Sequence, residues 1–326
     1  MSAPLRRREL LGGAIASAVS ASSCSRPLAP PAQVSIIRAA SYTDDLTAKI
    51  LRILQAHRLD VRGKRVVLKP NLVEYDASRS INTHPAVVYA ALEAFRSRGA
   101  ADVRIAEGPG HRRNTRELAD AAGFPEFIPK FHSLFTDLNL DDVSRVTLSK
   151  PFSRLSELYL PHTALGADLL VSLPKMKTHH WVGATLSMKN LFGLVPGGVY
   201  GWPKNVLHWA GIHECIADLH GLFPKHFSIV DGIVGMDGNG PIQGNQKPAG
   251  VLVGGSDLVA VDATCCRIMR LDPMKIQYLQ LAQSRSRTDL ANIRQIGETI
   301  ESVQTAFTLI PEWRSLRLPS QTGGPS

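Results

Sequence analysis

Long hydrophobic runs, clustered cysteines and aromatic residues are all scarce in this 326-residue chain, and each shortage excludes a class of protein. Only four cysteines occur, at positions 24, 215, 265 and 266, which is too few for a disulfide scaffold. No apolar stretch reaches the roughly 20 residues that a helix needs to cross a bilayer, so we expect no transmembrane span. Hydrophobic residues nevertheless make up 44% of the chain, which excludes a disordered protein.

Positive charge is in excess, with 37 Lys and Arg against 28 Asp and Glu. The basic residues are scattered among acidic ones, and no basic run alternates with aromatic residues, so we expect no nucleic-acid partner.

Part of the excess lies at the N-terminus. Arg6, Arg7 and Arg8 precede an uncharged, mildly apolar stretch from Leu10 to Ala21, which is typical of an export signal. Two arginines, a variable residue and two leucines resemble the twin-arginine signal. We therefore expect residues 1–24 to be a signal peptide that engages the twin-arginine translocation machinery. The mature protein would then lie in the periplasm or cell envelope.

Cys24 leaves two ways of processing this signal open. Small residues surround it, so a lipid anchor at Cys24 is one outcome and simple cleavage near Ala21 is the other. The lipid-anchor motif usually has Leu three positions before the cysteine, where this chain has Ala21. A basic tail on a cytosolic protein is the alternative to a signal of either kind.

The rest of the chain alternates between strand-like and helix-like patterns. This alternation predicts an α/β fold with a mainly parallel sheet, built from βαβ units with helices on both faces. We expect one domain over residues 25–310 and a disordered tail over 311–326. The predicted strands are 34–39, 65–69, 102–106, 169–173, 227–231 and 250–254, and the predicted helices are 44–57, 83–99, 114–122, 182–192, 206–222 and 258–270.

Charged and amide residues follow several predicted strands. Lys69 ends one predicted strand and Asn71 follows it, Glu107 follows the next strand, and Lys175 and Lys177 follow a third. Ligands of parallel sheets bind outside the carboxyl ends of the strands, and lysine ammonium groups suit an anion. The sequence therefore predicts a basic cleft at this edge for a small anionic molecule.

Two glycine-rich segments allow further sites. In the segment 107–114, Arg112 and the start of the next helix suit an anion, although a plain tight turn explains the pattern equally well. In the segment 231–240, Asp231 and Asp237 are oxygen ligands of the sort that a divalent cation prefers. A structural glycine loop without metal is the alternative there.

Residues 175–193 are the most informative segment. The predicted helix 182–192 places Lys189 and Asn190 on a polar face. His179 or His180 would stand at the start of this helix, where the helix dipole would lower the pKa of the imidazole. A lysine–lysine–histidine group followed by a further lysine and asparagine favours a functional site over a chance cluster.

Eight short motifs occur in an order that resembles the prokaryotic domain of unknown function 362 family, from about residue 34 to residue 300. They are Lys-Pro-Asn-Leu at 69–72, Thr-His-Pro at 83–85, Glu-Gly-Pro-Gly at 107–110, Pro-Lys-Met-Lys-Thr-His at 174–179, Met-Lys-Asn-Leu-Phe-Gly at 188–193, Val-Asp-Gly-Ile-Val-Gly-Met at 230–236, Gly-Asn-Gly-Pro at 238–241 and Val-Ala-Val-Asp-Ala at 259–263. The resemblance implies no general activity, because none is established for the family. Some members carry an added ferredoxin module, but this chain has no cysteine cluster, so we expect no iron–sulfur cluster.

Two classes of function remain open. In the first, the protein is an enzyme with His179, Glu107 and Lys177 as catalytic residues, and a divalent metal at Asp231 and Asp237 is optional. In the second, it is a non-catalytic periplasmic binding or assembly protein that uses the same cleft. The predicted substrate-binding residues are Lys69, Asn71, His84, Lys175, Lys189, Asn190 and Arg112.

Overall fold

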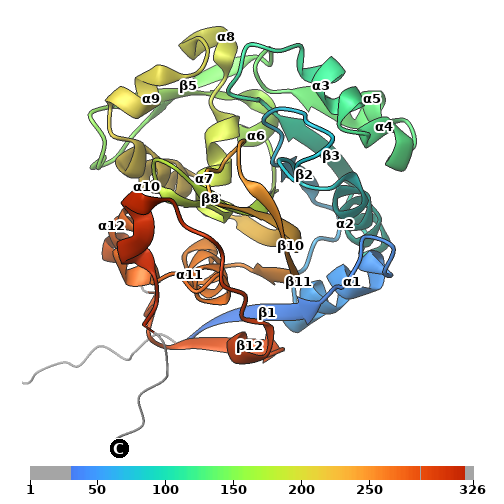
Figure 1. The fold of residues 1–326 in the computed structure, drawn as a ribbon. Helices are drawn as coiled ribbons and strands as arrows, with labels where there is room; N and C mark the ends of the chain where they lie inside the picture. The colour runs from blue at the N-terminus through green and yellow to red at the C-terminus, as the bar shows by residue number, and fades with distance from the viewer. Residues whose placement is uncertain (1–30, 287, 320–326) are drawn as a thin grey trace, which may run out of the picture. The chain divides into compact units, whose positions relative to one another are not determined.

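The computed structural model describes residues 31–286 and 288–319 (Figure 1). The predicted signal peptide, with Cys24, lies outside these residues, as does the end of the predicted tail from residue 320 onward. None of the helices within the described ranges has both the length and the apolar character that crossing a membrane requires.

A ten-stranded mixed sheet organises the domain, with strand order β12-β1-β11-β10-β7-β2-β3-β4 and with β8 and β9 attached beside β10. Most neighbouring strands are parallel, whereas β1–β11, β10–β11 and β8–β9 pair antiparallel. The strands are β1 (Ala32–Arg38), β2 (Arg65–Pro70), β3 (Asp102–Glu107), β4 (Phe135–Asp137), β7 (Leu169–Leu173), β8 (Lys175–His179), β9 (Gly183–Thr185), β10 (His226–Asp237), β11 (Asn245–Gly255) and β12 (Ile293–Gly297). A separate hairpin pairs β5 (Val143–Thr147) with β6 (Glu157–Pro161).

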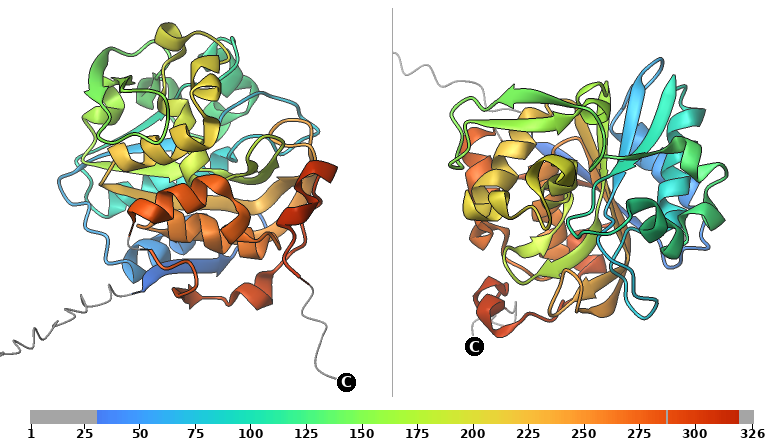
Figure 2. Two further views of the ribbon diagram at one scale, coloured as in Figure 1. Left: turned by 90° about the vertical axis from the view of Figure 1, so that its left-hand side faces the viewer. Right: turned by 90° about the horizontal axis from the view of Figure 1, so that it is seen from above.

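Helices cover both faces of the sheet, as Figure 2 shows in the view from above. On one face lie α1 (Leu46–Ala56) and α2 (Pro85–Ser97), and on the other lie α10 (Ile212–Leu222), α11 (Leu258–Ile268) and α12 (Gln277–Arg285). The shorter helices are α3 (Thr115–Ala121), α4 (Phe124–Phe127), α5 (Phe131–Leu134), α6 (His162–Leu165), α7 (Ser187–Asn190), α8 (Gly197–Tyr200), α9 (Asn205–Trp209) and α13 (Ile300–Val303), and the 3-10 helices are η1 (Leu191–Leu194), η2 (Pro273–Lys275) and η3 (Pro311–Leu316).

The alternation of side chains along the strands explains the two layers. In β2, Val66 and Leu68 pack into the core beneath α1 and α2, whereas Val67 packs into the opposite core. Since successive side chains of a strand point to opposite faces, a sheet buried on both sides needs apolar residues at every position. The mainly parallel α/β architecture predicted from the sequence is therefore confirmed.

The segment around residue 180 differs from the prediction. The expected helix over 182–192 is wrong, because residues 175–185 form the β8–β9 hairpin and only the short α7 and η1 follow it. Gly183 has φ +81°, and a Cβ there would come within 2.7 Å of Leu316, so the chain turns at a place that suits only glycine.

Three further differences are smaller. The predicted helix over 206–222 is interrupted at Gly211, which has φ +109°. The helix predicted over 83–99 begins later, because His84 caps α2 and its ring accepts a hydrogen bond from Ala86 N at 3.1 Å. Residues 311–316, expected in a disordered tail, form η3, where Trp313 Nε1 donates to His180 O at 2.9 Å.

Candidate functional site

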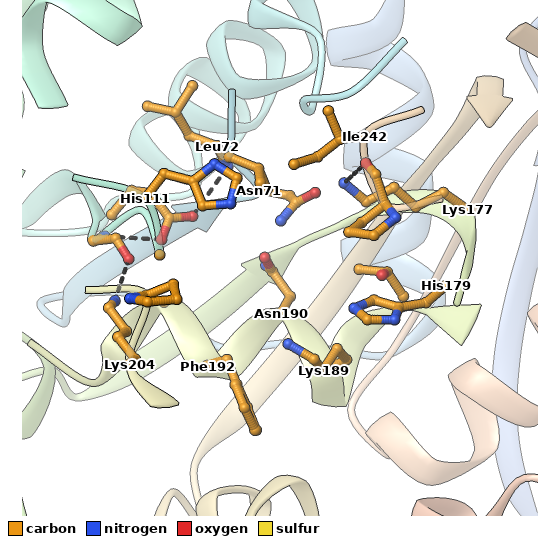
Figure 3. A pocket seen from close by; sticks show the side chains of 18 of the residues that line it. Asn71, Leu72, His111, Lys177, His179, Lys189, Asn190, Phe192, Lys204 and Ile242 are labelled. Carbon is orange, nitrogen blue, oxygen red and sulfur yellow. Dashed lines mark hydrogen bonds between the residues drawn. The ribbon is translucent and has the colours of Figure 1, made fainter. Parts of the chain in front are cut away.

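A cavity of about 230 Å³ lies where the carboxyl ends of β2 and β3 meet the β8–β9 hairpin and α7 (Figure 3). The register of the sheet places Lys69 beside Ser172, and the two strands flanking it end at the same edge. Seven of the residues predicted to form the site line this one cavity. They are Lys69, Asn71, Glu107, Lys177, His179, Lys189 and Asn190.

A buried ion pair forms the floor of the cavity. Lys69 Nζ donates to Glu107 Oε2 at 2.6 Å, and both side chains are 1% exposed. Lys69 also donates to Pro70 O at 3.0 Å and Asn190 Oδ1 at 3.2 Å. Burial lowers the pKa of Lys69, and the Glu107 carboxylate opposes that shift.

Glu107 is held on both of its oxygens. Besides the contact with Lys69, Oε2 accepts from Leu72 N at 3.2 Å and Oε1 accepts from Gly108 N at 2.8 Å. Gly193 passes so close to the pair that a Cβ there would overlap Glu107 Oε1 and lie 2.5 Å from Lys69 Nζ. The glycine that ends the 188–193 motif therefore makes room for the ion pair.

Lys177 comes from β8 and is fully buried. Its ammonium donates to Ile81 O at 2.8 Å and Pro241 O at 3.2 Å, so backbone carbonyls replace a carboxylate partner. Burial lowers its pKa well below the usual value, and the charges of Lys175 and Lys189 add to the effect.

Lys189 and Lys204 bring two more amines to the same space. Burial lowers the pKa of each to about 7. Lys204 donates to Gly108 O at 2.5 Å, whereas Lys189 Nζ lies 3.8 Å from the centre of the Phe192 ring. In Figure 3 the two side chains approach the cavity from the side of Phe192.

His179 ends β8 and is 6% exposed. Its Nδ1 accepts a hydrogen bond from Trp181 N at 3.0 Å, which assigns the proton of the neutral ring to Nε2. The pKa of His179 is well below its ordinary value, first because of burial and then because of the Lys189 charge. The predicted direction of this shift is thus found, but its cause is burial in a strand and not a helix dipole.

Three side chains around the cavity hold buried polar atoms without a hydrogen-bond partner among the described residues. They are Asn71 Oδ1, Thr185 Oγ1 and His208 Nδ1. An unpaired buried polar atom is costly, so most such atoms in folded proteins are paired. Because all three atoms lie around the same cavity, a ligand bound there could form hydrogen bonds with them.

Two other predicted residues, Lys175 and His84, line a second cavity of about 400 Å³, and a third, Asp231, forms hydrogen bonds with both of them. Lys175 Nζ donates to Asp231 Oδ2 at 2.6 Å and to the Tyr42 hydroxyl at 2.9 Å. The ring of His84 stacks on Tyr42 at 3.7 Å, and burial lowers its pKa to about 4. Lys175, Asp231 and His84 therefore form a second polar cluster. It is separate from the first cavity, which we call the lysine cavity because Lys69, Lys177, Lys189 and Lys204 line it.

The structure does not bring the remaining predicted residues to the lysine cavity. Arg112 is exposed, and Asp237 accepts from Thr308 N at 2.8 Å. Throughout residues 31–286 and 288–319, no three His, Cys, Asp or Glu side chains are grouped so that they could hold a metal ion. Asp231 is paired with Lys175 instead, so the predicted metal site gains no support from these contacts.

Sequence reasoning did not find Lys204, Thr185 or His208 as site residues. Lys204 stands in a loop at the start of α9 with φ +66°, and no spacing links it to the strand ends. Thr185 belongs to β9, which was expected to be helical. His208 occurs in α9 in a histidine-rich stretch of the sequence but without a partner histidine at metal-binding spacing, so this stretch indicated a site there only weakly.

Comparisons with known proteins identify the family of this chain. A family model described as "Domain of unknown function (DUF362)" matches residues 66–267. The chain is 28% identical over 263 residues to the thylakoid-associated protein sll1697 of Synechocystis sp., covering 77% of this chain and 78% of that protein. The lactate racemase apoprotein of Thermoanaerobacterium thermosaccharolyticum aligns with a TM-score of 0.48 and 16% identity, over 73% of this chain and 57% of the racemase chain.

Proposed function

We propose that this chain, which belongs to the DUF362 family, binds a small anionic molecule in the lysine cavity. One observation carries the proposal. Lys177, Lys189 and Lys204 line the cavity, and no carboxylate of the described residues lies within ion-pairing distance of any of them. The single carboxylate in the cavity wall, Glu107, is already paired with Lys69.

Electrostatics explains why such a cavity suits an anion. Removing an ammonium group from water costs several kcal/mol unless a partner compensates for the lost hydration. Backbone carbonyls compensate for part of this cost at Lys177 and Lys204, but they supply no net negative charge. A carboxylate or phosphate group entering the cavity would supply it, and would raise the pKa of Lys189 and Lys204 from about 7.

The unpaired polar atoms of the cavity wall further restrict the chemical class of the ligand. Asn71 Oδ1 can only accept a hydrogen bond, which a hydroxyl or N–H group of the ligand or a water bound beside the ligand would donate. Thr185 Oγ1 can donate or accept. A small organic acid with a second polar group, such as a hydroxyl, amino or carbonyl group, matches the cavity better than a bare inorganic anion.

The same site supports two modes of action. As an enzyme, the protein would use the Nε2–H of His179 to polarise the ligand and Lys177 to hold it. Glu107 is a poor general base, because its oxygens accept three hydrogen bonds from Lys69, Leu72 and Gly108. That saturation favours the alternative function, capture of the anion without acid–base turnover.

Binding is tested by titrating oxalate, malate and inorganic phosphate into the purified protein, with calorimetry and thermal denaturation as readouts. We expect at least one of these anions to raise the melting temperature, because a ligand at 100 times its Kd stabilises by about 2.7 kcal/mol. Lys177→Met should abolish this effect, whereas Lys225→Met, at an exposed position, should retain it. A Lys177→Met protein with unchanged affinity would contradict the proposal.

Export is a separate proposal that rests on the sequence of residues 1–24. We propose that the twin-arginine machinery delivers the folded protein to the periplasm or cell envelope. Replacing Arg7 and Arg8 by lysine in a native host should leave the precursor in the cytoplasm. Cys24→Ala separates the two processing routes, because it changes membrane attachment only if Cys24 carries a lipid.

A further inference from the structure

The four lysines of the cavity differ in one respect that matters for chemistry. Lys69, Lys177 and Lys204 each donate to at least one oxygen at hydrogen-bonding distance. For Lys189 Nζ, the described residues offer no such acceptor. Its neighbour is the face of Phe192, and the side chain is only partly buried because it opens into the cavity.

This difference suits Lys69, Lys177 and Lys204 to binding an anion, and it suits Lys189 to acting as a nucleophile. An amine whose N–H groups donate to fixed carbonyl oxygens is held in place by them, so it would have to break those hydrogen bonds to turn its lone pair toward a ligand. An amine beside an aromatic face and open space can lose a proton without breaking a hydrogen bond. Burial and the nearby charge of Lys69 lower the pKa of Lys189 to about 7, so a large share of it is the free amine just above neutrality.

We propose that Lys189 forms an imine with the carbonyl carbon of a 2-oxo acid held in the cavity, an inference that rests on the proposed anion site. The carboxylate of such a ligand would face Lys177 and Lys204, which have N–H groups left to donate. Its ketone would then lie toward Lys189, which Figure 3 shows on the same side of the cavity as His179.

The step is balanced without an oxidant or reductant. The lone pair of Lys189 Nζ attacks the carbonyl carbon, the C=O π bond opens, and a proton moves from nitrogen to oxygen to give a carbinolamine. The C–O bond then breaks as the second N–H proton leaves, which releases one water and forms the C=N bond. His179 Nε2–H assists by donating a hydrogen bond to the carbonyl oxygen while negative charge develops there.

The experiment traps the imine in the full-length protein. Pyruvate and sodium borohydride are added together at about pH 8, and the modified lysine is identified by peptide mass spectrometry. We expect one reduced-pyruvate adduct per chain, on the peptide that contains Lys189. Lys189→Arg keeps a positive charge but removes the nucleophile, so the adduct should fall at least tenfold, whereas Lys225→Arg should retain it. Trapping with wild-type protein alone already maps the site, so the test survives a variant that fails to fold.

Oxalate separates this inference from the proposal beneath it. Oxalate resembles pyruvate in charge and size but has no ketone. Oxalate binding without a pyruvate adduct would overturn the imine and leave the anion site standing. An adduct spread over surface lysines, or one that persists in Lys189→Arg, would overturn the imine as well. If none of oxalate, pyruvate, malate and phosphate binds, both proposals fail together.

Discussion

Removing the charge of Glu107 tests whether the cavity floor is a true buried ion pair. At the 2.6 Å distance between Lys69 Nζ and Glu107 Oε2, two unit charges attract by about 6 kcal/mol at an effective dielectric constant of ~20. Glu107→Gln forfeits this attraction but leaves Lys69 its contacts with Pro70 O and Asn190 Oδ1. We therefore expect the free energy of unfolding to fall by about 3–5 kcal/mol, as is usual when one partner of a buried pair is lost.

Urea denaturation followed by circular dichroism measures this loss, with the m-value as a check that both proteins unfold in the same way. Asp168→Asn is the control, since it removes an ion pair with Arg65 at 3.1 Å whose side chains are 63% and 39% exposed. Solvent screens that pair, so its loss should be far smaller. The double variant Lys69→Met/Glu107→Gln should lose less than the sum of the single variants. A Glu107→Gln protein within about 1 kcal/mol of the wild type would refute the reasoning.

Three further predictions concern the same cavity. Gly193→Ala should lower the free energy of unfolding by about 1–3 kcal/mol in urea titrations, because its Cβ would overlap Glu107. Thr185→Val should raise it by about 1 kcal/mol, because an unpaired buried hydroxyl disappears, while oxalate affinity measured by calorimetry falls. Unfolded lysines keep their protons to about pH 10, whereas folded Lys189 and Lys204 lose theirs near pH 7. The unfolded state therefore binds more protons between these values, so stability in urea should rise with pH across this window, and oxalate affinity should fall.

The sheet was largely predictable because its strands are short, apolar and buried on both sides. Residues 169–173 form β7 with the predicted bounds, and all five are buried. Asp45 and Asp257 cap α1 and α11 through ordinary side-chain hydrogen bonds, which is why these two helices begin where their sequences suggest. Here local propensity and tertiary packing favour the same structure.

The candidate site was predictable in composition but not in geometry. The prediction that Lys69, Glu107 and Lys177 lie together at one edge of the sheet agrees with the cavity that they line. Lys175 was expected beside them, yet it pairs with Asp231 in the second polar cluster, because β8 leaves the regular register of β10 between the two lysines. The shift in the pairing of β8 with β10 therefore places the predicted residues in two separate sites instead of one cleft. No pattern of residues in the sequence predicts such a shift.

Strand β8 shows why the secondary structure was hardest to predict in the segment that forms the candidate site. Lys-Met-Lys-Thr-His has neither the alternation of a half-buried strand nor the apolar run of a buried one, yet all five residues are buried. Burying such a strand is costly, and carbonyl groups of irregular segments, such as Ile81 O and Pro241 O, offset only part of the cost at Lys177. A strand with a purely structural role would be more stable with apolar residues in place of these lysines. Local rules are broken in this way mainly at functional sites, so the segment that misled the secondary-structure prediction is itself an argument for a ligand in the cavity.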